Sequence, residues 1–156
     1  DIVTAYLQGF IDCKVYLDIP EGYQPSTRKE EHLLKTHNGK LALKLNKSIY
    51  GLVQSGYIWN QTFITYLEKL GFKQLSTDGC IFTYKRAHTK IILGLYVDDC
   101  IILYKTYHDL QWLLKALSQR FKFKNLGQLQ KTLGIEVTYK KNGHISIFFI
   151  FSFVYF

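Results

Sequence analysis

Hydrophobic residues recur at helical spacing in two parts of the chain. Between residues 56 and 70 the apolar positions are Trp59, Phe63, Tyr66, Leu67 and Leu70. Gly71 then provides a stop signal for a helix. A second stripe consists of Leu110, Leu113, Leu114, Leu117 and Phe121. Side chains three and four positions apart lie on one face of a helix, so both segments are predicted to be amphipathic helices.

Short apolar runs bounded by polar turns predict β-strands. Residues 91–95 and 101–103 are apolar and flank a tight polar tip, which predicts a β-hairpin. Residues 81–84 predict another strand, and residues 85–90 predict a polar turn that leads into the hairpin. In residues 41–45 apolar and polar side chains alternate, as in a half-buried strand.

The last part of the chain predicts one more hairpin and then loses its pattern. Residues 133–139 and 145–149 are predicted to pair, because an Asn-Gly pair between them is a strong turn signal. From residue 148 the chain is apolar without periodicity, so we divide it into a domain over residues 1–147 and a tail over residues 148–156. The tail is too short to span a bilayer, which needs about 20 residues. A buried strand is the alternative for this tail.

One long segment predicts neither helix nor strand. Residues 25–40 are polar and charged and show no apolar period, so they are predicted to form an exposed loop. Before this segment, Pro20, Glu21 and Gly22 signal a turn.

Composition indicates a folded domain with a basic surface. The 156 residues are 47% hydrophobic and 21% charged, which suits one domain with its own core. A formal net charge of +8 favours a polyanionic partner. Cys13, Cys80 and Cys100 are odd in number and widely spaced, so we expect buried free thiols rather than a disulfide framework or a zinc cluster. A reducing intracellular setting fits, and no secretory signal peptide is recognisable.

The tip of the first hairpin carries the most informative chemistry. Asp98 and Asp99 follow Tyr96 and Val97 directly, and adjacent carboxylates repel each other unless they are solvated or neutralised. A divalent cation resolves that repulsion, and hard oxygen ligands suit magnesium. A solvated turn is the plain alternative, because Asp is common in turns. The Tyr-Val pair in its apolar frame favours the metal-binding interpretation.

Further blocks of the sequence match one family in order and spacing. They are residues 1–9, 15–23, 47–59, 70–80, 96–99 and 125–137. The first reads Asp-Ile-Val-Thr-Ala-Tyr-Leu-Gln-Gly, and the third contains Lys-Ser-Ile-Tyr-Gly-Leu-Val-Gln. Together they resemble the reverse transcriptase of copia-type long-terminal-repeat retrotransposons, which is one segment of a Pol polyprotein.

The resemblance implies a fold and a set of site residues. The fold is expected to be α+β, with a polymerase palm-like antiparallel sheet and helices packed on one face. Asp1, Asp98 and Asp99 would be the catalytic carboxylates and would hold two Mg²⁺ ions, with Mn²⁺ as a possible substitute. Tyr6 would bind the incoming nucleotide as a steric gate, with a core aromatic as the alternative, and Gln54 would lie near the same nucleotide.

The resemblance also implies partners and a location. An RNA or DNA template-primer and deoxynucleoside triphosphates would be the substrates of an RNA-directed DNA polymerase. No membrane partner is expected. Integrase and ribonuclease H would belong to the remainder of the polyprotein, and an intact element would act in the cytoplasm, in a virus-like particle.

Several features predict a fragment that is inactive by itself. The sequence lacks methionine and begins on Asp1, which the resemblance marks as catalytic, so we expect a domain truncated at its N-terminus. Val53 and the run Ser55, Gly56 and Tyr57 depart from the family pattern and remove two basic groups. A catalytically dead nucleic-acid-binding remnant of a decayed element is the first alternative. An unrelated α+β domain with an accidental Asp-Asp turn is the second.

Overall fold

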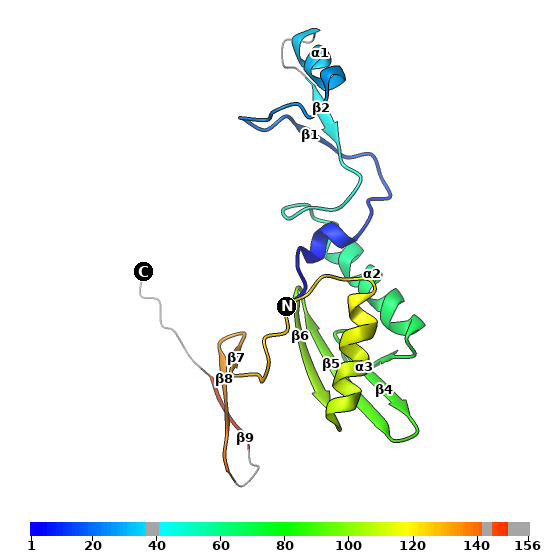
Figure 1. Ribbon diagram of the computed structural model, residues 1–156, viewed down its shortest axis with the longest axis vertical. Helices are drawn as coiled ribbons and strands as arrows, with labels where there is room; N and C mark the ends of the chain where they lie inside the picture. Colours follow the sequence, from blue (N-terminus) through cyan, green and yellow to red (C-terminus); the bar gives the residue numbers. More distant parts are fainter. Residues whose placement is uncertain (37–40, 142–144, 150–156) are drawn as a thin grey trace.

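The computed structural model describes residues 1–36, 41–141 and 145–149. Its central body is an antiparallel sheet of strands β3 to β6 in sequential order. Their bounds are β3 Lys73–Gln74, β4 Ile81–Arg86, β5 Thr89–Tyr96 and β6 Asp99–Tyr104. Helices α2 (Ser55–Lys69) and α3 (Tyr107–Ser118) pack on one face of this sheet (Figure 1). A short 3₁₀ helix, η1 (Ala5–Gln8), lies against α2.

Alternation along β5 explains which face of the sheet is covered. Ile91, Leu93 and Leu95 are buried, whereas Ile92 between them is 43% exposed. Neighbouring side chains of a strand point to opposite faces, so one face meets the helices and the other meets solvent. The buried cluster consists of Ile2, Ala5, Trp59, Phe63, Ile64, Leu67, Phe72, Phe82, Ile91, Leu93, Leu95, Leu113, Leu117 and Phe121.

Aromatic rings form the centre of this core. Trp59 and Phe63 of α2 lie 5.2 Å apart, and each ring centroid is 5.5 Å from that of Phe121. The ring of Tyr66 meets Phe121 edge-on at 5.2 Å, and its hydroxyl donates to the Ala116 carbonyl at 2.6 Å. These contacts attach α2 to α3 and to the chain that follows α3.

Two smaller units extend from the central body (Figure 1). The first pairs β1 (Tyr16–Asp18) with β2 (Ala42–Lys44) and carries helix α1 (Arg28–Thr36). The second is a sheet of β7 (Lys131–Thr132), β8 (Ile135–Tyr139) and β9 (Ile145–Phe149). Among the described elements, neither unit packs against the central sheet or its helices.

The structure confirms the α+β class and most predicted elements. Both amphipathic helices form, although α3 ends at Ser118 and Phe121 lies beyond it as a buried core residue. Strands pair Ile91 with Tyr104 and Leu95 with Cys100, as the first predicted hairpin requires. The final hairpin also forms, with β8 paired to β9.

The predicted loop over residues 25–40 is wrong in its central part, because Arg28–Thr36 form α1. Its only apolar residues, Leu33 and Leu34, are adjacent, so the sequence shows no apolar period here, and no residue of the helix is buried. Local polar contacts hold it instead: Glu30 accepts from the Ser26 amide at 2.7 Å, and Lys35 pairs with Glu31 at 2.6 Å. Residues 37–40 lie outside the described part of the chain.

Three further expectations need correction or delimitation. The polar turn over residues 85–90 is shorter than predicted, because cross-strand pairing continues to Arg86 and Thr89. Cys13 and Cys80 are exposed rather than buried. Of the proposed tail, residues 148 and 149 end β9, and residues 150–156 are outside the described chain. In the described residues, no helix has the length and apolar character needed to cross a membrane.

Candidate active site

The hairpin tip is a two-residue turn between β5 and β6. Tyr96 and Asp99 form the last cross-strand pair, which leaves Val97 and Asp98 as the turn residues. Val97 has a φ of 54°, in the left-handed region that a β-branched side chain avoids. Two-residue turns of this kind favour glycine at their first position, so valine there stores about 1–3 kcal/mol of strain.

Two hydrogen bonds from distant segments hold this strained turn. Trp59 Nε1 of α2 donates to the Val97 carbonyl at 2.6 Å. The backbone amide of Ile2 donates to the Asp98 carbonyl, also at 2.6 Å. Both donors belong to buried residues, so the core itself fixes the position of the tip.

The segment that carries Asp1 is docked beside the tip. Ile2 forms an antiparallel bridge with Phe123. On either side of the bridge, the Val3 amide donates to the Lys122 carbonyl at 2.9 Å and the Lys124 amide donates to the Asp1 carbonyl at 2.8 Å. Asp1 therefore lies next to the turn, although its neighbour Ile2 forms an isolated bridge rather than part of a strand.

Cys100 lies within electrostatic reach of the charged groups near the hairpin tip. Burial raises the pKa of its thiol to about 12. Within this net shift of the pKa, the α-amino group of Asp1 has a lowering effect, and the carboxylates of Asp99 and Asp98 add to the rise that burial causes. All three aspartate residues thus contribute a charged group within electrostatic reach of one side chain.

The residue types at the tip suit a hard divalent cation, because carboxylate oxygens are the ligands that Mg²⁺ prefers. Their side chains are not gathered: in the described part of the chain, no three Asp, Glu, His or Cys side chains lie close enough to hold one ion. The structure therefore brings the backbones of Asp1, Asp98 and Asp99 together without assembling a three-carboxylate cluster.

Tyr6 of η1 lies next to Tyr50, which belongs to the matching sequence block over residues 47–59. Its ring centroid is 4.5 Å from that of Tyr50. Desolvation raises the pKa of Tyr50, and the charges of Asp98 and Tyr6 raise it further. The buried Ser48 hydroxyl donates to the Tyr6 carbonyl, which attaches this block to η1. Tyr6, Tyr50 and Asp98 therefore form one neighbourhood.

Gln54 occupies a different place. It precedes the first residue of α2, and its side-chain amide lies 4.0 Å from the Cys13 sulfur, at the far limit of a weak hydrogen bond. No hydrogen bond among the described residues joins Gln54 to the hairpin tip. The structure thus groups Tyr6 with Asp98 but does not show Gln54 with them.

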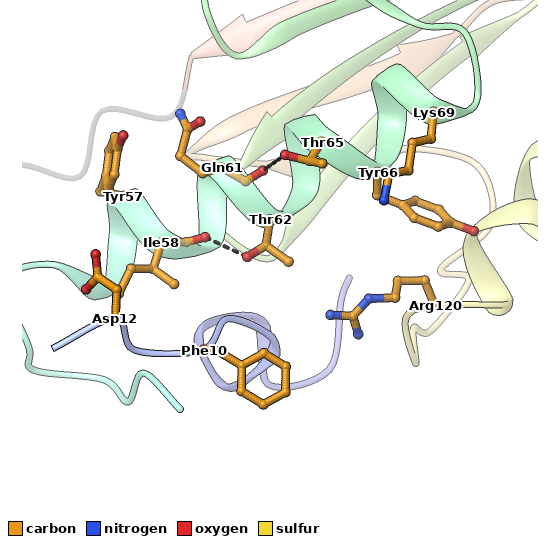
Figure 2. A pocket seen from close by; sticks show the side chains of 10 residues that line it. All are labelled: Phe10, Asp12, Tyr57, Ile58, Gln61, Thr62, Thr65, Tyr66, Lys69 and Arg120. Carbon is orange, nitrogen blue, oxygen red and sulfur yellow. Dashed lines mark hydrogen bonds between the residues drawn. The ribbon is translucent and has the colours of Figure 1, made fainter. Parts of the chain in front are cut away.

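A hollow lies on the outer face of α2, away from the sheet. It is an open groove of about 530 Å³, and its lining includes Phe10, Ile58, Thr62, Lys69 and Arg120 (Figure 2). The Thr62 and Thr65 hydroxyls donate to helix carbonyls, so their protons are not available to a ligand. None of the hairpin-tip residues lines this groove.

Sequence reasoning missed two contributors to the site. Trp59 was expected in the core, where it is 2% exposed, but it also anchors the Val97 carbonyl. Tyr50 stands in a matching block with no role predicted for it, yet its ring contacts that of Tyr6. Both lie within the block over residues 47–59, and the match of that block to the family pattern was the signal in the sequence that could have identified them.

Comparison with known proteins identifies the class of protein. The family model described as reverse transcriptase (RNA-dependent DNA polymerase) matches residues 1–152. The chain belongs to this family, in its copia-type retrotransposon branch.

Among similar proteins is the retrovirus-related Pol polyprotein from transposon TNT 1-94 of Nicotiana tabacum, 32% identical over 139 residues. That match covers 88% of this chain and 10% of the relative. The Pol polyprotein from transposon RE2 of Arabidopsis thaliana is 33% identical over 147 residues, 94% of this chain and 9% of the relative. The chain thus spans about a tenth of the length of these relatives. No solved structure shows a significant match to it.

Proposed function

We propose that this chain is the palm part of an RNA-directed DNA polymerase, in which Asp1, Asp98 and Asp99 hold two Mg²⁺ ions, or Mn²⁺ in their place. The docking of Asp1 supports this most directly, because the Ile2 amide binds the Asp98 carbonyl at 2.6 Å. Ninety-seven positions separate Asp1 and Asp98 in sequence, and a carboxylate site for metal-assisted nucleotidyl transfer gives their proximity a chemical role. When bound, the ions stabilise charge on the attacking and leaving oxygens of nucleotidyl transfer.

The protein's own groups would position the substrates. A primer 3′-hydroxyl and a deoxynucleoside triphosphate would meet at the hairpin tip. The Tyr6 ring, supported by Tyr50 at 4.5 Å, would lie beneath the sugar and exclude a 2′-hydroxyl. Gln54 would approach the nucleotide from the start of α2. The strained Val97 turn would keep the two adjacent carboxylates in fixed directions.

The larger assembly is part of the same proposal. The relatives are Pol polyproteins, so integrase and ribonuclease H would accompany this segment in an intact element, in a cytoplasmic virus-like particle. A template-primer would be the polyanion that the net charge of +8 attracts.

A non-catalytic nucleic-acid-binding remnant is the second candidate. Val53 is 100% exposed at a position where the family pattern calls for a basic residue. A fully solvated apolar side chain there offers no contact to phosphate. The absence of a three-carboxylate cluster among the described residues favours the same candidate.

Metal binding separates the two candidates. Mn²⁺ binding, followed by electron paramagnetic resonance, should weaken at least tenfold in Asp98→Asn, by loss of a charged ligand. Asp18→Asn, on the exposed strand β1, removes the same charge away from the tip and should leave Mn²⁺ binding unchanged. Equal binding by both variants contradicts the metal site and leaves the remnant.

Primer extension by the isolated chain should be slight or absent with Mg²⁺ or Mn²⁺. Nucleic-acid binding should persist, because phosphate contacts are spread over many residues whereas the metal site depends on three carboxylates. Asp98→Asn should bind a primer-template as well as the parent chain or slightly better, since it removes a negative charge near phosphate. Efficient extension by the isolated chain contradicts its proposed inactivity.

A further inference from the structure

The chain that follows α3 alternates cations with core aromatics. Phe121 is 2% exposed and Phe123 is partly buried against the core, while Lys122 and Lys124 between and after them are exposed. In an extended segment, side chains two positions apart lie on the same side and about 6.6 Å apart. Lys122 and Lys124 therefore project together away from the core.

Backbone register places this pair beside the candidate catalytic residue. The antiparallel bridge between Ile2 and Phe123 sets Asp1 opposite Lys124 and Val3 opposite Lys122. Directly opposed residues of an antiparallel pair have Cβ atoms about 4.5–5.5 Å apart. Two exposed lysines consequently lie opposite the segment that carries Asp1 to the hairpin tip.

Both ammonium groups are available for a ligand. Within the described residues, neither Lys122 nor Lys124 has a side-chain hydrogen bond or an ion pair. Arg120, the third cation of the segment, is different: its guanidinium donates to the Gln8 carbonyl at 3.2 Å and lies 5.2 Å from the centroid of the Phe121 ring. Figure 2 shows this arginine directed toward the N-terminal segment. Arg120 is thus a structural contact, whereas the side chains of the two lysines have no hydrogen-bond or ion-pair partner in the part of the chain that the structure describes.

We propose that Lys122 and Lys124 bind successive phosphates of one nucleic-acid strand where it passes the carboxylate site. Their separation is comparable to that of neighbouring phosphates along a strand, and exposed lysines act as point charges toward phosphate. The proposal rests on the polymerase function proposed above, because the hairpin tip is what directs a nucleic acid to this edge. It adds a specific contact surface to the general basic charge of the chain.

Salt dependence of primer-template binding tests this contact in the absence of divalent metal. Each lost phosphate contact lowers the slope of log affinity against log salt concentration by about 0.9. K122Q/K124Q should therefore reduce the slope by about 2 and weaken binding at low salt. K122R/K124R keeps both charges and should restore the parent slope, which excludes an effect of altered folding.

Lys85 and Lys90 provide a matched control. They are exposed cross-strand partners at the end of the same sheet that is remote from the tip, about 20 Å away along β5. K85Q/K90Q removes the same charge and should leave the slope nearly unchanged. Equal slopes for the two glutamine variants, or no salt-dependent binding by the parent chain, overturn the proposal. Equal competition by polyglutamate also overturns it, in favour of an acidic protein partner.

The outcome is separable from that of the proposed function. Failure of Mn²⁺ binding with an intact lysine effect contradicts the metal site and leaves the phosphate contact standing. Normal Mn²⁺ binding without a lysine effect contradicts only the phosphate contact.

Discussion

The two larger sheets of this molecule have similar strand patterns and different surroundings. In the central sheet, Ile91 and Leu93 are at most 1% exposed, because α2 and α3 cover that face. In the sheet of β7 to β9, Ile145 and Ile147 are 56% and 60% exposed. Alternation alone thus identifies a strand, but a packed partner decides whether its apolar side chains stabilise the fold.

The candidate site belongs to the covered sheet for a physical reason. A valine at a φ of 54° persists only where surrounding contacts outweigh its strain. Trp59 and Ile2 supply those contacts from the core. The β7–β8 turn of the uncovered sheet also has a non-glycine residue with a positive φ, Leu133 at 50°, but among the described elements no helix packs on that sheet. What distinguishes the covered sheet is therefore that its turn is held by hydrogen bonds from core residues.

The largest expected difference is in stability, between truncating a side chain of the helix that covers the central sheet and truncating one in the uncovered sheet. Phe63→Ala removes a fully buried ring that contacts Trp59, Phe82 and Phe121, and should lower the free energy of unfolding by about 3–5 kcal/mol. Ile147→Ala in β9 should change it by less than about 0.5 kcal/mol. Urea unfolding followed by tryptophan fluorescence measures both, and similar costs would remove the contrast between the sheets.

Thiol reactivity should report the same burial. The pKa of Cys100, raised to about 12 by burial, keeps its thiol protonated at pH 8, where its thiolate fraction is roughly a thousandfold below that of an ordinary cysteine. Iodoacetamide should therefore modify the exposed Cys13 and Cys80 first, as followed by mass spectrometry. In urea all three should react alike; rapid native labelling of Cys100 argues against a closed central sheet.

Removing a hydrogen bond that anchors the hairpin tip should have an intermediate effect on stability. Trp59→Phe keeps an aromatic ring in the core but leaves the Val97 carbonyl without its donor, at a cost of about 1–3 kcal/mol. Hydrogen exchange should quicken at the tip of β5 and β6 more than in β4. Tyr57→Phe, at an exposed position of the same helix, is the control and should change neither quantity.

The smallest expected effect on stability comes from removing a helix N-cap. It should differ between α3, which packs on the central sheet, and α1, which does not. Thr106 and Asp109 form a reciprocal capping box on α3, so Thr106→Ala should lower global stability by about 1 kcal/mol. Thr27→Ala removes the corresponding contact to the Glu30 amide on α1 and should reduce local helicity without shifting the unfolding midpoint. Circular dichroism with urea unfolding compares them, and a global effect of Thr27→Ala would mean that α1 is part of the central fold.

The capping box also predicts a pH dependence. Burial opposes ionisation of Asp109, but hydrogen bonds from Thr106 and Thr89 outweigh it and hold the pKa below its ordinary value. The stabilisation from this carboxylate is therefore present above the unfolded-state pKa, about 3.9, and is lost as pH falls through the lower folded value. Asp109→Asn should remove that part of the acid sensitivity.

The sequence determined the elements whose own periodicity requires them. Apolar spacing identified α2 and α3, and the apolar frame around Asp98 and Asp99 identified the hairpin. The family resemblance, which the comparisons confirm, marked Asp1 as the distant partner. The hydrophobic pattern did not predict α1, because the only apolar residues of that helix, Leu33 and Leu34, are adjacent and form no helical period.

Only the tertiary structure decided which sheet is covered, how Asp1 reaches the tip and what it meets there. Those outcomes depend on contacts between segments far apart in the chain, such as Ile2 with Phe123 and Trp59 with Val97. The two-residue turn places Val97 at a positive φ, as the corresponding turns do for Ala87 and Leu133, and only the tertiary structure adds the two hydrogen bonds that hold the Val97 turn against the core. The proposed phosphate contact of Lys122 and Lys124 likewise depends on the backbone register that places them beside Asp1.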